Sequence, residues 1–208
     1  MRLPSTTSLL LTISLLSLSG ALPAPAPDAT LNLVPRACST IGPAIINALS
    51  KASPDTPNTS QPFRLARTGG PNSNTIKSAI TFEYIPQGAG ATGCMLQIQF
   101  PALTTDNQIA SGTGTQADVW STQPFTDGSN TWNHPPVKDQ FVATTIFPTQ
   151  KSSQVFKTIL VSNSCSPTMS YLLELSDWQQ GAGSVQFYNS LGGKQGLQPI
   201  GFSMIFNC

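Results

Sequence analysis

The chain has 208 residues, of which only 9% are charged, and its formal net charge at pH 7 is +1. Of its ten basic and nine acidic residues, Arg2, Arg36 and Asp28 precede Cys38, which leaves eight of each sign in the remainder. A neutral segment with so few charges lacks the basic surface that nucleic acid or an anionic membrane requires, and we expect neither as a partner.

The first 36 residues have the composition of a leader rather than of a fold. Arg2 is followed by a short apolar run from Leu9 to Leu18 and then by the small residues Ser19-Gly20-Ala21, which predicts a secretory signal peptide over residues 1–21. No run in the chain reaches the roughly 20 apolar residues that a membrane span requires. Residues 22–36, rich in Pro and Ala, are expected to be a propeptide or a linker.

Residues 37–208 have the length of a single domain with a full core. All four cysteines lie in this part: Cys38, Cys94, Cys165 and Cys208. An even number of cysteines in a secreted chain predicts two disulfides, out of three possible pairings. We expect Cys38–Cys208, which would join the two ends of the domain, and Cys94–Cys165, which would join two strands. The cysteines lack CxxC spacing and the chain has one histidine, so we expect neither a metal nor a cofactor.

One helix is predicted, over residues Ala37 to Lys51. Ser39 or Thr40 can cap it, Pro43 is tolerated in a first turn, and Ile41, Ile45 and Leu49 then fall on one stripe. The Pro-, Ser- and Asn-rich segment that follows, Ala52 to Asn74, is expected to be an exposed loop. It contains the sequon Asn58-Thr59-Ser60, which predicts glycosylation of Asn58.

The rest of the chain has the period-two alternation of short β-strands. The clearest case is Cys94 to Phe100, where Cys94, Leu96, Ile98 and Phe100 alternate with Met95, Gln97 and Gln99. The remaining predicted strands are Ile80–Ile85, Gln116–Ser121, Gln140–Phe147, Gln154–Ser162, Ser170–Leu175, Ser184–Tyr188 and Ile200–Phe206. Ile80, Phe82 and Tyr84 are expected to point inward, and the strands on either side of Pro148-Thr149-Gln150-Lys151 are expected to pair. About eight strands separated by turns predict an all-β fold, a β-sandwich or jelly roll.

Residues 74–208 combine several motifs: Cys94-x-Leu96-x-Ile98-x-Phe100-Pro101, a Trp-containing middle, Asn163-Ser164-Cys165 before Tyr171-Leu172-Leu173, and a Phe-rich strand ending at Cys208. In these motifs the chain resembles the carboxy-terminal domain of ubiquitin 3 binding protein, the But-two domain family. The resemblance implies a fungal, secreted protein and supplies no catalytic residues. The family name implies a ubiquitin-pathway interaction, which a signal peptide disfavours.

Two constellations are candidates for catalysis. His134, in Trp132-Asn133-His134-Pro135-Pro136, has no Gly-x-Ser-x-Gly elbow that would supply a nucleophile, so we interpret it as a surface loop residue. Glu83 and Glu174 each lie in a predicted strand, and two carboxylates about 5–5.5 Å apart would suit a retaining glycosidase. Both alternate with apolar neighbours, however, and are expected on the solvent side of their strands.

The aromatic residues are the better candidates for binding. Aromatic rings stack on the apolar faces of sugars, and a neutral protein suits a neutral glycan. Trp132 and Trp178, with His134, are the candidate binding residues, whereas Trp120 is expected in the core. The sequence therefore predicts a monomeric, non-enzymatic, secreted or cell-wall-associated protein that binds cell-wall polysaccharide or an extracellular protein. The alternatives are a glycoside hydrolase using Glu83 and Glu174, and a ubiquitin-pathway interactor.

Overall fold

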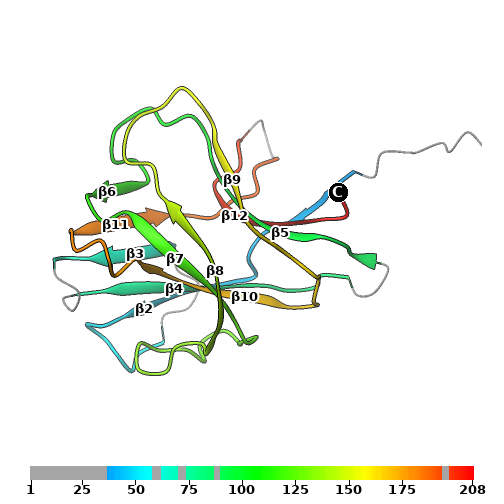
Figure 1. Cartoon of the computed structure of the whole chain (residues 1–208), viewed down its shortest axis with the longest axis horizontal. Helices are drawn as coiled ribbons and strands as arrows, with labels where there is room; N and C mark the ends of the chain where they lie inside the picture. Colours follow the sequence, from blue (N-terminus) through cyan, green and yellow to red (C-terminus); the bar gives the residue numbers. More distant parts are fainter. Residues whose placement is uncertain (1–36, 58–61, 70–73, 87–89, 194–196) are drawn as a thin grey trace, which may run out of the picture. The chain divides into compact units, whose positions relative to one another are not determined.

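Alternating apolar residues form twelve β-strands in the part of the chain that the computed structural model describes (Figure 1). The structure describes residues 37–57, 62–69, 74–86, 90–193 and 197–208, and no helix occurs among them. These residues belong to one compact unit, Arg36–Cys208. The predicted signal peptide, the propeptide or linker, and the sequon at Asn58 lie outside the described residues.

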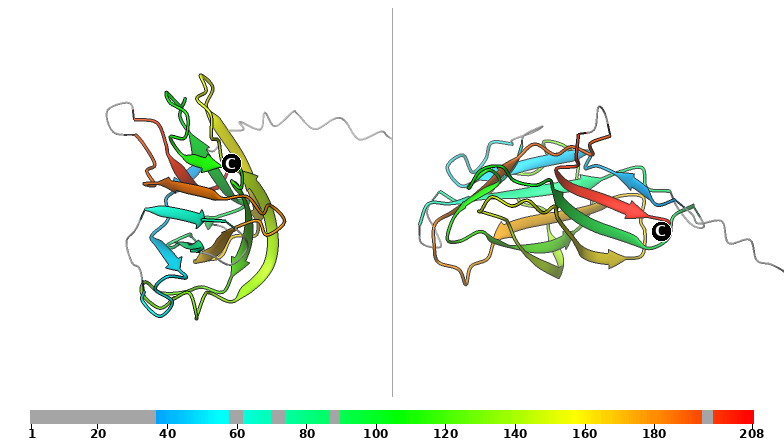
Figure 2. Two further views of the ribbon diagram at one scale, coloured as in Figure 1. Left: turned by 90° about the vertical axis from the view of Figure 1, so that its left-hand side faces the viewer. Right: turned by 90° about the horizontal axis from the view of Figure 1, so that it is seen from above.

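Four strands form the smaller sheet, in the order β1-β12-β5-β9, with every pair antiparallel. They are β1 (Ser39–Ile41), β5 (Cys94–Phe100), β9 (Phe156–Asn163) and β12 (Gly201–Phe206). In the right-hand view of Figure 2, the red β12 lies beside the green strand β5. The strand β5 coincides with the predicted Cys94–Phe100, and it is an inner strand of this sheet.

The larger sheet has eight strands, which run in the order β6-β11-β3-β4-β10-β7-β8, while β2 pairs with β4. They are β2 (Ile45–Ser50), β3 (Phe63–Arg67), β4 (Ile76–Phe82), β6 (Ala110–Gly112), β7 (Gln116–Thr122), β8 (Lys138–Ile146), β10 (Met169–Leu175) and β11 (Gly183–Phe187). Each strand pair in this sheet is antiparallel.

The two sheets share one hydrophobic core, which makes the fold a β-sandwich, as predicted. Phe63 of the larger sheet stacks on Phe187, with ring centroids 4.8 Å apart, and also contacts Phe202 of the smaller sheet at 4.9 Å. Phe100 of β5 meets Phe187 edge to face at 5.0 Å. Burying one such side chain contributes about 1.5–3 kcal/mol, so these interlocked rings are a main source of cohesion between the sheets.

The predicted helix over Ala37 to Lys51 is wrong, because this segment forms β1 and β2. Strand β1 pairs with β12 in the smaller sheet, and β2 pairs with β4 in the larger one. Gly42-Pro43-Ala44 lies between them, and proline cannot donate a ladder hydrogen bond. The chain therefore changes sheets at Pro43. The Ile-rich sequence on both sides is compatible with strands, and tertiary pairing decides between the two conformations.

Three further expectations are also wrong. The segment Ala52 to Asn74 is not a continuous exposed loop, because it contains β3, in which Phe63 and Leu65 are buried. The segments after and before Pro148 do not pair with each other, because β8 pairs with β7 in one sheet and β9 with β5 in the other. Tyr84 does not point inward, because β4 ends at Phe82 and Tyr84 has a positive φ of 61° and is 89% exposed. A left-handed residue breaks the alternation on which the prediction depended.

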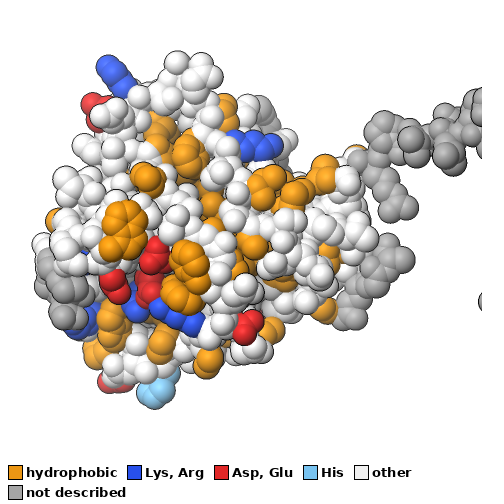
Figure 3. Space-filling model, viewed as in Figure 1, with side chains coloured by type: hydrophobic (Ala, Val, Ile, Leu, Met, Phe, Trp, Pro, Cys, Tyr) orange, Lys and Arg blue, Asp and Glu red, His pale blue; other side chains and the backbone are white. Residues whose placement is uncertain are grey.

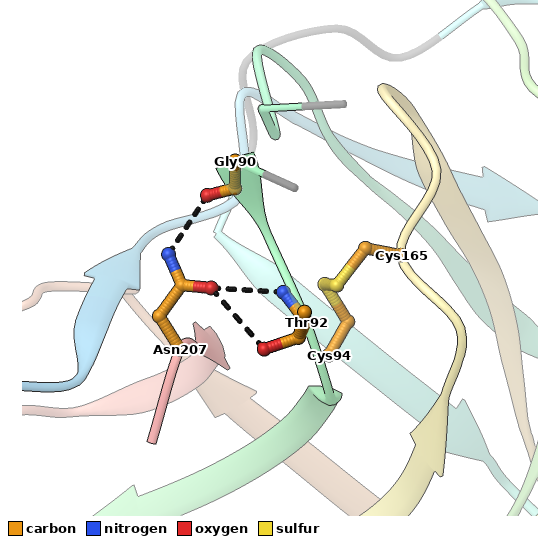
Figure 4. The surroundings of a disulfide bond; sticks show 5 residues. All are labelled: Gly90, Thr92, Cys94, Cys165 and Asn207. Carbon is orange, nitrogen blue, oxygen red and sulfur yellow. Dashed lines mark hydrogen bonds between the residues drawn. A yellow bond between two sulfur atoms is a disulfide. The ribbon is translucent and has the colours of Figure 1, made fainter. Parts of the chain in front are cut away.

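Both predicted disulfides are present, Cys38–Cys208 and Cys94–Cys165. Figure 4 shows the second bridge beside the segment that leads into β5. The Asn207 side chain fixes this segment: its amide group donates to the Gly90 carbonyl at 2.8 Å and its oxygen accepts from the Thr92 backbone N–H at 2.8 Å. The C-terminal end of β12 and the start of β5 are therefore joined by hydrogen bonds next to the Cys94–Cys165 bridge.

Candidate functional site

The face of the larger sheet directed away from the shared core carries a second, small hydrophobic cluster. Along β10, Tyr171, Leu173 and Leu175 belong to the main core, so the alternating residues Leu172 and Glu174 point to the opposite face. Leu172 joins Leu49 of β2 and Ala79 of β4 there, and Phe125 and Trp132 pack against this cluster. This outer face of the sheet is thus covered in part by the segment between β7 and β8.

Hydrogen bonds hold that segment, residues 123–137, in place. The Asn133 backbone N–H donates to the Pro54 carbonyl at 3.1 Å, and its side-chain amide donates to the Asp55 carboxylate at 2.8 Å. The backbone N–H of His134 donates to the Thr131 hydroxyl at 3.1 Å, and the imidazole itself is exposed. His134 therefore lies on the surface, whereas Trp132 is half-buried against the sheet.

Next to this cluster lies a continuous line of contacts between aromatic and charged side chains, which we call the aromatic–ion row. It consists of Trp132, Lys77, Glu174, Lys138, Trp120 and Phe141. Figure 3 shows hydrophobic, basic and acidic side chains side by side over the region of β7 and β8.

The contacts within the aromatic–ion row are close. The Lys77 ammonium is 2.7 Å from a Glu174 carboxylate oxygen, and the Lys138 ammonium donates to the other oxygen. Each lysine also lies over an indole ring, Lys77 at 4.9 Å from the centroid of Trp132 and Lys138 at 4.5 Å from that of Trp120.

Sheet register explains why these residues meet. Lys77, Glu174 and Trp120 come from the neighbouring strands β4, β10 and β7, and Lys138 and Phe141 come from β8. Phe141 is the register partner of Trp120, and their rings meet edge to face at 5.2 Å. Four strands are separated by three spacings of about 4.8 Å, so the row extends roughly 14 Å across the sheet.

Electrostatics keep Glu174 ionised. Burial opposes its ionisation, but the hydrogen bonds from Lys138 and Lys77 outweigh that effect and lower the pKa of the carboxyl below its usual value. Its side chain is 13% exposed, and both carboxylate oxygens are engaged. A carboxylate with a lowered pKa is poorly suited to be the general acid of a glycosidase, which requires a raised pKa.

The sheet does not bring Glu83 and Glu174 together. Phe82, the residue before Glu83, pairs with Met169, and Glu174 lies five positions further along β10. Five strand residues span about 17 Å, which separates Glu174 from the Phe82–Met169 pair along the strand direction. Glu83 follows Phe82 and so lies still further from Glu174. Retaining and inverting glycosidases need carboxyl groups about 5–5.5 Å and 6.5–9.5 Å apart, respectively.

Trp178 lies outside the row, in the turn between β10 and β11. The buried guanidinium of Arg67 shapes this turn by donating to the carbonyls of Ser176, at 3.2 Å, and of Gln179. Trp178, between these two residues, is 65% exposed. The turn therefore presents Trp178 to solvent at a different place from Trp132.

Sequence reasoning missed most of the aromatic–ion row. It singled out Trp132 and Glu174 but assigned Trp120 to the core, whereas this side chain is half-buried on the outer face. Lys77, Lys138 and Phe141 were not identified. Trp120 precedes Ser121 on a strand whose Ala117 and Val119 are buried in the main core, and this parity is the signal that places Trp120 outward.

The chain matches no protein-family model and no curated protein sequence. The resemblance to the But-two domain family therefore stays a prediction from the motifs quoted above. Within the described ranges, no helix is long and apolar enough to cross a membrane. In the same residues, no three His, Cys, Asp or Glu side chains gather as metal ligands would.

Proposed function

We propose that this protein is a secreted, non-enzymatic glycan-binding protein, and that the aromatic–ion row is its binding surface. The observation that carries the proposal is the row itself: aromatic rings at both ends, with an ammonium–carboxylate–ammonium triplet between them.

The chemistry of the row suits a sugar chain. The exposed ring of Phe141, 46% accessible, and the half-buried Trp120 and Trp132 offer apolar surface for the C–H faces of sugar rings. The ammonium groups of Lys77 and Lys138, which Glu174 holds in position, can donate hydrogen bonds to sugar hydroxyls. The two lysine charges are opposed by Glu174 and by Asp118, the register partner of Glu174, so the surface is close to neutral and favours neutral glycans.

Secretion is supported by two observations. Residues 1–21 have the composition of a signal peptide, and the chain contains two disulfides with no free cysteine among the described residues. Both favour an extracellular or cell-wall location over the cytosolic setting of a ubiquitin-pathway interactor. The glycoside hydrolase alternative is disfavoured by the separation of Glu83 from Glu174.

The test is a pull-down of the oxidised protein on insoluble cell-wall polysaccharides, with binding isotherms for Phe141→Ala and Trp120→Ala. Removing an aromatic contact worth about 1.5 kcal/mol should weaken binding roughly tenfold. Tyr188→Ala is the matched control, because Tyr188 is an exposed aromatic outside the row. Absence of binding by the unmodified protein, or equal binding by all three variants, would refute the proposal. Release of reducing sugar would show an enzyme instead.

A further inference from the structure

Trp178 is an exposed aromatic residue that does not belong to the aromatic–ion row. It lies in the turn after β10, in the sequence Ser176-Asp177-Trp178-Gln179, and its side chain is 65% exposed. An indole ring offers a large apolar contact area, and it loses little conformational entropy on binding because the side chain has only two torsions. An indole that is held toward solvent on a fixed backbone is therefore well suited to contact a ligand.

Arg67 fixes the backbone of this turn. Its guanidinium, which is 2% exposed, donates to the carbonyl oxygens of Ser176 and Gln179, one on either side of Trp178. The carboxylate of Asp177 is 3.9 Å from the guanidinium and 90% exposed, so it compensates little of the buried charge. A buried charge is costly unless hydrogen bonds satisfy it. The guanidinium therefore strongly favours the turn conformation that supplies both carbonyl groups.

Two further sets of contacts hold the turn. The Gln179 backbone N–H donates to the Ser176 carbonyl at 3.1 Å, and the Gln179 side-chain oxygen accepts from the Gln116 backbone N–H at 3.2 Å. Just after the turn, Gly181 packs so closely on Thr113 that a Cβ at this glycine would overlap the threonine side chain. Because the turn is already ordered in the free protein, contact with its indole requires little reorganisation.

The turn adjoins the aromatic–ion row. The Ser176 hydroxyl donates to the carboxylate of Asp118, which is the register partner of Glu174 on β7. Trp178 follows Glu174 by four residues, so the Cα atoms of these two residues are at most about 15 Å apart. This limit is similar to the length of the row, roughly 14 Å. A chain of several sugar rings can therefore contact both the turn and the row, whereas a single sugar ring is too short.

We propose that Trp178 is a second sugar-stacking contact, and that the ligand is an extended, neutral polysaccharide chain that spans the turn and the aromatic–ion row. This inference rests on the proposed function, because the row supplies the other contacts to the chain. The exposed neighbours of Trp178 in the sequence are polar, namely Asp177 and Gln180. An apolar ring flanked by hydrogen-bonding groups matches a sugar, which has an apolar C–H face and hydroxyl groups at its edge.

The first experiment compares disaccharides with hexasaccharides of the cello-, laminari- and chito-oligosaccharide series by titration calorimetry. In at least one series the hexasaccharide should bind more tightly than the disaccharide. Trp178→Ala should weaken binding of that hexasaccharide about tenfold, as expected for the loss of one aromatic contact, and should bring the two affinities closer together. Tyr188→Ala, which removes another exposed aromatic ring, should change neither affinity. Both residues are exposed, so both variants should keep the melting temperature of the unmodified protein.

Tryptophan fluorescence tests the contact directly. A ligand that covers the exposed indole of Trp178 should shift its emission to shorter wavelength. Trp178→Phe keeps an aromatic ring, so it should retain most of the hexasaccharide affinity while the emission shift on binding becomes smaller. An equal shift in Trp178→Phe, normal hexasaccharide binding by Trp178→Ala, or equal affinity for short and long ligands would overturn the inference.

The same variants separate this inference from the proposed function. If Phe141→Ala loses hexasaccharide binding and Trp178→Ala does not, the aromatic–ion row is the binding surface and Trp178 takes no part in it. If Trp178→Ala loses binding and Phe141→Ala and Trp120→Ala do not, Trp178 is supported as a sugar contact and the row is refuted. If no oligosaccharide binds to the unmodified protein, both proposals are refuted.

Discussion

The two disulfides make unequal and calculable contributions to stability. Cys94–Cys165 closes a loop with a sequence separation of 71 residues, and Cys38–Cys208 closes one of 170. The chain-entropy relation for restricting the unfolded state gives about 4.4 kcal/mol for the shorter loop and about 5.2 kcal/mol for the longer one. Replacing both cysteines of one bridge by alanine should therefore lower the free energy of unfolding by about 4–5 kcal/mol in either case.

The assay is equilibrium unfolding in guanidinium chloride, followed by tryptophan fluorescence, for the unmodified protein and the two double-alanine variants. For a total stability near the middle of the usual range of 5–15 kcal/mol, about 9–10 kcal/mol, each variant should fold and the fully reduced protein should not. Cys94 is buried, and its replacement adds a packing loss that the exposed Cys38 does not have. A loss below about 1 kcal/mol for Cys38–Cys208 would show that residual structure in the unfolded chain, rather than loop length, sets the effect.

Two other substitutions test the electrostatics and the core. Glu174→Gln should lower the free energy of unfolding at pH 7 and make it depend less on pH in the acid range. The pKa of Glu174 is lower in the folded state than the value of about 4.3 in the unfolded chain. The stabilisation from the ionised carboxylate is therefore present above about pH 4.3 and is lost as the pH falls through the folded-state pKa. Thermal melts from pH 7 to pH 3 measure this, and identical pH profiles would contradict the assignment. Phe63→Ala should cost about 3–5 kcal/mol, because Phe63 is fully buried and contacts rings of both sheets. A denaturation midpoint close to that of the unmodified protein would show that the sheets do not depend on this ring.

The features that the sequence predicted well are those with a local signal. Strict alternation from Cys94 to Phe100 identified an inner strand with its correct bounds, because one face of that strand is buried along its whole length. The pairing of the cysteines was also predicted correctly. It depended only on two expectations: that one bridge joins the two ends of the domain and that the other joins two strands. The segment Ala37 to Lys51 was wrongly predicted to be a helix because Ile41, Ile45 and Leu49 have the four-residue spacing of a helical stripe. In the structure Ile41 lies in β1 of one sheet, and Ile45 and Leu49 lie in β2 of the other, so this spacing is also compatible with strands.

The aromatic–ion row depends on pairing between distant segments, which no local sequence pattern predicts. Lys77 and Lys138 meet at Glu174 only because β4, β10, β7 and β8 are neighbours in the sheet. The β7–β8 register also shifts between Val119 and Trp120 and again after Ser121. These shifts change which residues of the two strands are opposite each other, so alternation along one strand does not predict its neighbours on the other.

The Cys38–Cys208 bridge has a mechanical consequence. The Cα atoms of these two residues are 4.4 Å apart, and a covalent bond joins their side chains. A tensile load applied to the chain before Cys38 and at Cys208 is therefore carried by the bridge, and the strands between them are bypassed. A molecule anchored in a wall and pulled at its other end would keep both sheets intact until that single bond is reduced.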